Sequence, residues 1–253
     1  MLHRTFVHIS GVGYVTERRL WAAGVESWGH ALALPCAPRS FSPARWELIC
    51  DTLESSTTSL ASGDHRYFAG LLHARDHWRA FPEFRQRTAY VDIETDGLDY
   101  WSSVTVVGLY DGVRTRQYVA GDNLDQFALD IRDYSLLVTF NGATFDLPFL
   151  RRRMGNIFDQ LHVDLRYALG RLGHHGGLKA IERELGLARG GEIVGLGGED
   201  AVRLWNEYRR GRAEALELLL AYNRADVENL EVLAEIAYRR LWAGAAGEGT
   251  TPQ

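Results

Sequence analysis

The chain has 253 residues, of which 46% are hydrophobic and 24% are charged, as expected for a globular protein with an ordinary core. The formal net charge of −5 argues against a protein that coats nucleic acid by charge alone. It does not exclude a nuclease, because a metal-binding acidic cluster concentrates negative charge at one place. No apolar run approaches the roughly 20 residues of a membrane span, and Cys36 and Cys50 lack a metal-ligand spacing, so we expect a cytoplasmic protein with no membrane partner.

The first 86 residues predict a small helical region in two parts. Residues 1–34 have a compact helical pattern that is interrupted by Gly11-Val12-Gly13. Residues 35–86 form a connecting segment, with prolines and a Ser/Thr-rich stretch followed by a predicted helix over 65–80. The sequence itself does not identify a protein partner or an oligomeric state for this region.

Residues 87–243 predict a single α/β domain, and the apolar-poor tail 244–253 is expected to be disordered. Asp111-Gly112 predicts a two-residue hairpin between the second and third strands. The order of elements indicates three antiparallel strands followed by alternating helices and strands, which is a mixed five-stranded sheet flanked by helices. The strands are expected at 88–93, 104–110, 114–119, 136–140 and 162–164, and the helices at 125–132, 144–154, 178–185, 200–210 and 213–242.

Two carboxylates stand at the end of the first predicted strand, in Tyr90-Val91-Asp92-Ile93-Glu94-Thr95. Residues i and i+2 of a strand point to the same face, so Asp92 and Glu94 project together while Val91 and Ile93 enter the core. Two carboxylates this close repel each other unless a cation lies between them, and oxygen ligands suit Mg²⁺ or Mn²⁺. The alternative is that both acids end the strand at the surface.

Two further acids occupy helix positions. In Phe140-Asn141-Gly142-Ala143-Thr144-Phe145-Asp146, a strand runs into an Asn-Gly turn, and Asp146 falls in the first turn of the next helix, where an acid also serves as a cap. In the long last helix, Asp226 lies among leucines and valines, and Tyr222 lies one turn before it on the same face. An unpaired carboxylate is costly near a core, and a metal ion would remove that cost.

Together these residues resemble the DEDD exonucleases, the DnaQ-like branch of the ribonuclease-H-like superfamily. The resemblance covers 88–240. Ala221 stands where the histidine form of the third motif would need its base, so the match is to the tyrosine form, the DEDDy subgroup, and 178–187 resembles its YprB-type members. The three motifs are Asp92-x-Glu94, Asn141-x-x-x-Phe145-Asp146 and Tyr222-x-x-x-Asp226.

The resemblance implies a two-metal-ion 3′–5′ exonuclease that takes Mg²⁺ or Mn²⁺ and a nucleic acid with a free 3′ end. It implies that Asp92 bridges both ions and that Glu94 and Asp226 complete the site of the nucleophilic water. Asp146 would support the second ion. Tyr222 would orient the water, since its ordinary pKa near 10 makes it a poor base at neutral pH.

Other segments receive weaker interpretations. Asn141 and Phe145 are expected to lie near the bound nucleic acid, by resemblance only. Asp164 follows a short strand, and capping of the next helix is favoured over a role as a fifth acid. The glycine-rich stretch 190–198 lacks the lysine and the strand–helix context of a phosphate-binding loop, so a flexible connector is favoured.

The turn at Gly11-Val12-Gly13, followed by Arg18 and Arg19, resembles a helix–hairpin–helix unit. In such a unit, glycines allow the backbone to approach a phosphate at a helix N-terminus, and arginines add contacts. We expect contact with DNA or RNA, and the alternative is a small packing module.

Two other functions remain open on the sequence alone. A non-catalytic nucleic-acid-binding protein could retain this fold, although such proteins normally lose one of the acids and all are present here. A ribonuclease-H-like endonuclease is a closer alternative, but it would not require the Tyr222/Asp226 pairing.

Overall fold

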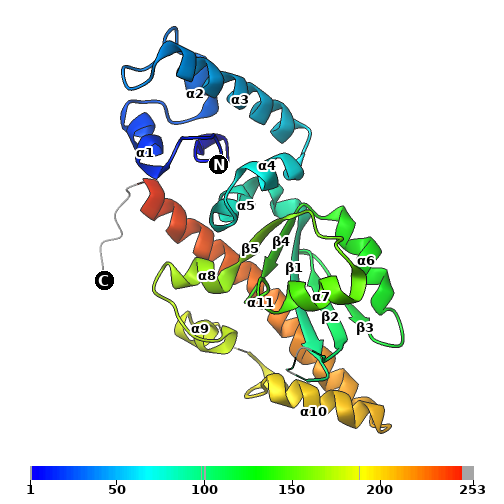
Figure 1. Ribbon diagram of the computed structural model, residues 1–253. Coiled ribbons are helices and arrows are strands. Elements are labelled where there is room, and N and C mark those ends of the chain that lie inside the picture. The colour runs from blue at the N-terminus through cyan, green and yellow to red at the C-terminus, as the bar shows by residue number, and fades with distance from the viewer. Residues whose placement is uncertain (1, 98, 100, 188, 247–253) are drawn as a thin grey trace.

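The computed structural model describes residues 2–97, 99, 101–187 and 189–246. Its centre is a five-stranded sheet in the order β3-β2-β1-β4-β5. The strands are β1 (Thr88–Thr95), β2 (Val104–Tyr110), β3 (Thr115–Val119), β4 (Leu136–Thr139) and β5 (Leu161–Asp164). The pairs β1/β2 and β2/β3 are antiparallel, whereas β1/β4 and β4/β5 are parallel. The predicted mixed five-stranded sheet flanked by helices is confirmed (Figure 1).

Helices cover both faces of the sheet and form the N-terminal region. They are α1 (Tyr14–Ala22), α2 (Trp28–Leu32), α3 (Pro43–Ala61), α4 (His65–Leu71), α5 (Phe81–Phe84), α6 (Phe127–Asp130), α7 (Asp146–Met154), α8 (Leu165–Gly170), α9 (Leu178–Glu184), α10 (Gly198–Arg209) and α11 (Ala213–Ala246). Figure 1 shows α7 in front of the sheet and α11 behind it, running from α10 to the N-terminal helices. Within the described ranges, no helix combines the length and apolar character that a bilayer span requires.

Strand β1 divides its side chains between two environments. Val91 and Ile93 belong to a core that includes residues of α6 and α7. Tyr90 belongs to the core on the opposite face, with residues of α11. Asp92 and Glu94 lie on this second face, since Asn223 of α11 donates a hydrogen bond to Asp92. The alternation expected from the sequence is therefore present, and the strand continues two residues further than predicted.

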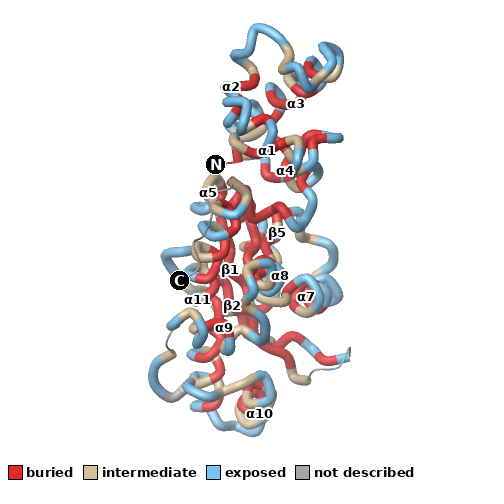
Figure 2. The backbone as a smooth tube through the Cα atoms, turned by 90° about the vertical axis from the view of Figure 1, so that its left-hand side faces the viewer, coloured by how far each residue is buried: buried red, intermediate tan, exposed pale blue. Residues whose placement is uncertain are grey.

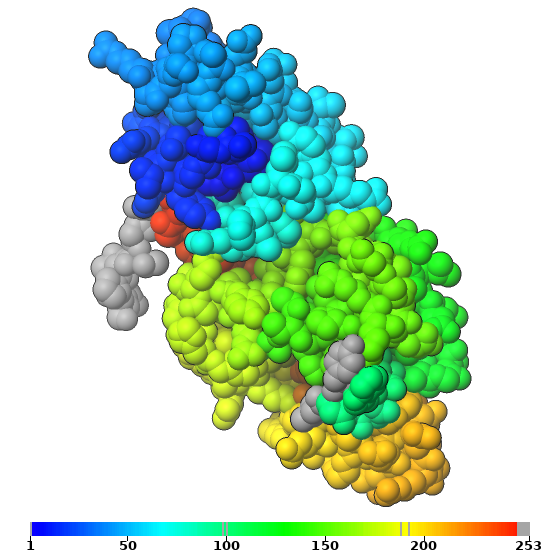
Figure 3. Space-filling view, viewed as in Figure 1, coloured from blue at the N-terminus to red at the C-terminus, as the bar shows by residue number. Residues whose placement is uncertain are grey.

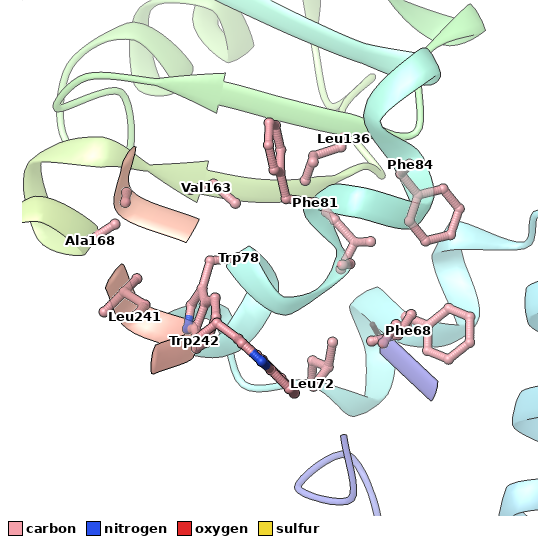
Figure 4. Close-up of a cluster of buried hydrophobic side chains, with 14 of the residues drawn as sticks. Phe68, Leu72, Trp78, Phe81, Phe84, Leu136, Val163, Ala168, Leu241 and Trp242 are labelled. Atoms are coloured by element: carbon pink, nitrogen blue, oxygen red, sulfur yellow. The ribbon is translucent and has the colours of Figure 1, made fainter. Parts of the chain in front are cut away.

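The N-terminal region shares one hydrophobic core with the sheet and the end of α11. Figure 4 shows this core, and Figure 2 shows buried residues in the N-terminal helices as well as in the strands. The labelled side chains come from the N-terminal region (Phe68, Leu72, Trp78, Phe81, Phe84), from the sheet and α8 (Leu136, Val163, Ala168), and from α11 (Leu241, Trp242). Whether 1–34 and 35–86 are separate folding units stays a prediction.

The helix predicted over 65–80 is wrong in one respect, because it is broken in the middle. Leu72 and His73 are extended, and the chain continues as a 3₁₀-helix, η2 (Ala74–Ala80). The break brings η2 against the edge strand β5, where the His162 amide donates to His77 Nδ1 at 3.0 Å. The tertiary contact with an otherwise open strand edge therefore overrides the helical pattern.

The Ser/Thr-rich stretch lies inside α3, which the sequence did not predict. The hydroxyls of Ser55, Ser56 and Thr57 each donate to the carbonyl four residues earlier, so they are satisfied within the helix. The predicted two-residue hairpin is also wrong. Four residues, 111–114, join β2 to β3, because the Asp111 carboxylate accepts from the amides of Val113 and Arg114 and builds a longer turn.

The predicted tail begins too early. Helix α11 continues to Ala246. The rest of the expected disordered tail, 247–253, lies outside the described residues.

Candidate active site

Three carboxylates from two elements meet beside the carboxyl end of β1. One oxygen from each of Asp92, Glu94 and Asp226 lies within 4.8 Å of the other two. Glu94 and Asp226 are buried, and Asp92 is partly buried. The first pair comes from alternate positions of β1 and the third acid from the middle of α11. Residues 131 positions or more apart in the sequence, such as Asp92 and Asn223, are thereby brought together.

The electrostatics of this cluster favour a bound cation. Burial, and then the neighbouring Asp226, raise the pKa of Asp92 and of Glu94 well above their ordinary values. Burial also raises the pKa of Asp226. Glu94 Oε1 is buried and has no hydrogen-bond partner in the described part of the chain. An all-oxygen donor set with an unpartnered buried oxygen fits Mg²⁺ or Mn²⁺.

Asp146 is the first residue of α7 and is 2% exposed. Its Oδ1 accepts a hydrogen bond from the Ile93 amide at 3.2 Å, so it is tied to β1 between the two strand acids. Burial raises the pKa of Asp146 to about 7. It lies outside the group of three acids described above, and its role as a metal ligand stays a prediction.

Tyr222 lies one helical turn before Asp226 and is buried. Its hydroxyl accepts a hydrogen bond from Lys179 Nζ at 2.6 Å, and the same ammonium lies 4.1 Å from the centre of the ring. Burial and then the charge of Asp226 raise the pKa of Tyr222. The hydroxyl therefore stays neutral at physiological pH and can donate a hydrogen bond into the site.

Two basic residues of the site were not identified from the sequence. Arg189 forms an ion pair with Asp226. It also forms a bidentate salt bridge with Glu182, in which Nε and Nη2 each donate a hydrogen bond of 2.7 Å to one carboxylate oxygen. Lys179 approaches Tyr222 from α9. Being the only lysine in a chain rich in arginine, Lys179 was a signal that could have been followed. No sequence pattern indicated that Arg189 lies in the site, because its position depends on how residues 189–197 fold against α9 and α11.

Asn223 and Gly108 set the position of Asp92. Asn223 is fully buried, and its Nδ2 donates to Asp92 Oδ2 at 3.1 Å while its Oδ1 accepts from Gln117 at 3.2 Å. A Cβ at Gly108 would lie 2.2 Å from Asn223 Oδ1, so glycine is what allows α11 to approach β2 this closely. A glycine inside a predicted strand was the available signal for this approach.

The turn between β4 and α7 is held by Asp164. Its carboxylate accepts from the amides of Asn141 and Ala143 at 2.8 and 3.0 Å, and it also caps α8 at Arg166. The capping interpretation of Asp164 is confirmed, with the turn as an additional partner. Asn141 adopts a positive φ of 68°, as its place in an Asn-Gly turn permits.

The residues expected to contact nucleic acid are not all brought together. Phe145 lines a cavity of about 170 Å³ with the three acids and Tyr222. The Asn141 side chain instead accepts a hydrogen bond from Arg166 at 2.7 Å.

The glycine turn lies in the N-terminal region. Gly11 has a φ of 73°, and the adjacent Ser10 carbonyl accepts from Arg45 of α3. Gly13 precedes α1, on which Arg18 and Arg19 are exposed. The residues before the turn form only a short 3₁₀-helix, Leu2–Arg4, so the helix–hairpin–helix interpretation stays a prediction.

A comparison with protein families decides the broad class. The sequence model of the RNase H superfamily matches residues 89–238. The chain belongs to this superfamily. The matched span contains all four acids and Tyr222, and RNase H-like nucleases use divalent metals. Membership therefore supports a nuclease that processes nucleic acid, and the buried acidic cluster is compatible with metal binding.

The other comparisons add little. Among solved structures, the chain is similar to the family B DNA polymerase from the hyperthermophilic archaeon Pyrobaculum calidifontis, with 20% identity and a TM-score of 0.47. The similarity covers 59% of this chain and 24% of the polymerase chain, so it spans about a quarter of that protein. No curated protein sequence matches the chain.

Proposed function

We propose that the chain is a two-metal-ion 3′–5′ exonuclease of the DEDDy type that releases nucleoside monophosphates from single-stranded DNA or RNA. The observation that carries the proposal is the convergence of Asp92, Glu94 and Asp226, with Tyr222 one turn from Asp226 on the same helix. An RNase H-like endonuclease has no need of this tyrosine, and a non-catalytic binder has no need of the complete acid set.

Some residues of the site would bind the metal ions, and others would orient the attacking water. Asp92, Glu94 and Asp226, with Asp146 beside them, would hold Mg²⁺ or Mn²⁺, which supply the charge that phosphodiester hydrolysis requires. The neutral Tyr222 hydroxyl donates a hydrogen bond to the attacking water and fixes its direction. Lys179 holds that hydroxyl in place.

Two further residues position the 3′-terminal nucleotide of the substrate and the Asp92 carboxylate relative to each other. Phe145 lines the same cavity as the acids and offers an apolar surface to the terminal base. Asn223 orients Asp92 by donating to its carboxylate. These contacts come from the N-cap residue of α7 and from α11, so small shifts of either helix would disturb the geometry on which the rate depends.

A single-stranded oligonucleotide labelled at its 5′ end tests the proposal. In Mn²⁺ or Mg²⁺, a descending ladder is expected, and EDTA should abolish it. Internal cuts would indicate an endonuclease, and an intact strand would indicate a binding protein. Both outcomes contradict the proposal.

A matched pair of variants ties the activity to the site. Asp226→Asn should lower the hydrolysis rate by about 10³-fold or more while circular dichroism stays unchanged. Asp51→Asn removes one exposed carboxylate on α3 of the N-terminal region and should retain the wild-type rate. A wild-type rate in Asp226→Asn would refute the assignment of the acids.

A further inference from the structure

Three cavities adjoin one another, two at the junction of the N-terminal region with the nuclease domain and the third beside them at the end of α8. Their volumes are about 410, 290 and 420 Å³, and Arg171 of the loop after α8 lines all three. Arg75 of η2 lines the first two. We refer to them together as the arginine groove. In Figure 3, the cyan part of the N-terminal region lies directly against the yellow-green residues near β5 and α8.

The charge of this groove is opposite to that of the chain. Two of the described residues that line it carry carboxylates, and both are already engaged: Glu17 pairs with the buried Arg79, and Asp164 accepts three backbone amides. The arginines that line it are Arg18, Arg75, Arg79, Arg166, Arg171 and Arg240. A chain of net charge −5 thus gathers positive charge along one junction.

Three of these arginines have no acidic partner. Among the described residues, no carboxylate lies within 4.0 Å of the guanidinium of Arg18, Arg75 or Arg171. Arg171 is oriented by a hydrogen bond to the Arg75 carbonyl at 2.9 Å and lies 6.0 Å from the ring centre of Trp78. Guanidinium groups without a counter-charge are suited to phosphate.

Aromatic surface accompanies the charge. Tyr167 lines two of the cavities and is 54% exposed, although it is large and hydrophobic. Trp78 forms part of the wall of the first cavity, together with Arg75 and Arg171. An exposed ring next to a row of arginines is the kind of surface on which unpaired bases stack while their backbone is bound.

The groove begins close to the acids. Ala143 and Asp164 line its first cavity, and Ala143 lies only three residues before Asp146. Strands β1, β4 and β5 are parallel, so the acids at the end of β1 and Asp164 at the end of β5 lie at the same edge of the sheet. The two strands that carry them are two strand spacings of about 4.8 Å apart, which is within the span of one or two nucleotides.

We infer that the arginine groove binds the phosphate backbone of a single-stranded nucleic acid upstream of its 3′ end. The strand would run from the acids past the turn after β4, over Tyr167 and Arg171, to Arg18 of α1. The inference rests on the proposed exonuclease function and adds the path of the substrate. It also gives the N-terminal region a role in binding through the junction with η2 and α8.

Binding and hydrolysis with long and short substrates test the groove. The variant Arg18→Gln/Arg75→Gln/Arg171→Gln should bind a labelled 20-nucleotide single strand about 10-fold more weakly, as measured by fluorescence anisotropy in EDTA. The slope of log affinity against log salt concentration should become shallower by about 2, since each of the three lost phosphate contacts on a single strand accounts for about 0.7. Hydrolysis of a dinucleotide, which reaches only the acids, should keep its wild-type rate.

A second triple variant controls for the change in net charge. Arg39→Gln/Arg132→Gln/Arg209→Gln removes three exposed arginines that line none of the three cavities, and its affinity should stay close to wild type. Equal losses in both triple variants, or no loss in either, would overturn the inference. Arg18→Glu, a change at an exposed position, provides the same comparison if the groove triple variant does not fold.

The two proposals fail in different ways. If the groove triple variant binds the single strand more weakly than wild type but wild type does not hydrolyse it in Mn²⁺, the exonuclease function is wrong and the groove is still a binding site for a single strand. If the protein produces the ladder and the groove triple variant binds the single strand as tightly as wild type, the inference on the groove is wrong and the exonuclease function is unaffected.

Discussion

Substitution of Gly108 by alanine is expected to damage the fold and the site together. Gly108 lies on β2 opposite Asp92, and a Cβ there would come within 2.2 Å of Asn223 Oδ1 and 2.9 Å of Val227 Cγ1. Both neighbours belong to α11, and both are fully buried, so neither side chain can move into solvent. The helix must shift away from the sheet, or Asn223 must leave its position.

The cost has two parts. Forcing one extra methyl into a packed core destabilises by about 1–3 kcal/mol. Displacing Asn223 also breaks its hydrogen bond to the Asp92 carboxylate, and hydrogen bonds to charged groups are worth about 1.5–3 kcal/mol. We therefore expect Gly108→Ala to lower the free energy of unfolding by about 3 kcal/mol, with a loss of hydrolysis of about 10-fold or more at temperatures where the variant is folded.

Urea unfolding in EDTA measures the first effect, and ladder formation in Mn²⁺ measures the second. Gly70→Ala is the matched control, because Gly70 is exposed on α4 with nothing within 4 Å of a new Cβ. Shortening the neighbour in Gly108→Ala/Asn223→Ala should restore part of the stability but not the activity, since Asp92 still lacks its donor. Strictly additive losses in the double variant would refute the clash as the cause.

Two further predictions concern buried charge. Burial lowers the pKa of His8 and of His162 to about 4, so the unfolded chain, whose histidines titrate near 6.5, takes up protons first as the pH falls. Stability should be lost from pH 6.5 downward, by about 2 kcal/mol per histidine at pH 5, and a His162→Gln variant with the same pH slope in urea unfolding as wild type would contradict this. Arg189→Met removes the cation that pairs with both Asp226 and Glu182, and leaves Glu182 only its hydrogen bond from Asn229 among the described residues. Metal-free stability should therefore fall by about 3 kcal/mol and Mn²⁺ should raise the Tm more than in wild type, whereas the exposed Arg203→Met should change neither.

The parts of the fold that local patterns determine could be predicted. The period-2 alternation of β1 predicted that Asp92 and Glu94 lie on one face of the strand. The spacing of four residues predicted that Tyr222 and Asp226 lie on one face of the last helix. The resemblance to a known family then indicated that the two elements meet. Their proximity rests on long-range packing, such as the approach of α11 to Gly108, which no short window of sequence contains.

The parts that could not be predicted depend on partners distant in the sequence. Helix 65–80 breaks because η2 pairs its His77 with the edge of β5. Arg189 enters the site only because the chain after α9 folds back over Glu182 and Asp226. In each case, a polar group finds its partner through tertiary structure, and local propensity gives no indication of it.

Helix α11 connects the two proposals physically. Its middle carries Tyr222, Asn223 and Asp226, and its last turns, with Leu241 and Trp242, pack in the same core as the N-terminal region. A long helix with packed side chains at both ends holds the two regions at a fixed separation. The arginine groove, which Arg240 of the same helix also lines, is therefore held in register with the acids. A strand bound in the groove would then reach the acids without a domain movement, so the rate on long strands should depend on the groove arginines even when the active-site residues are intact.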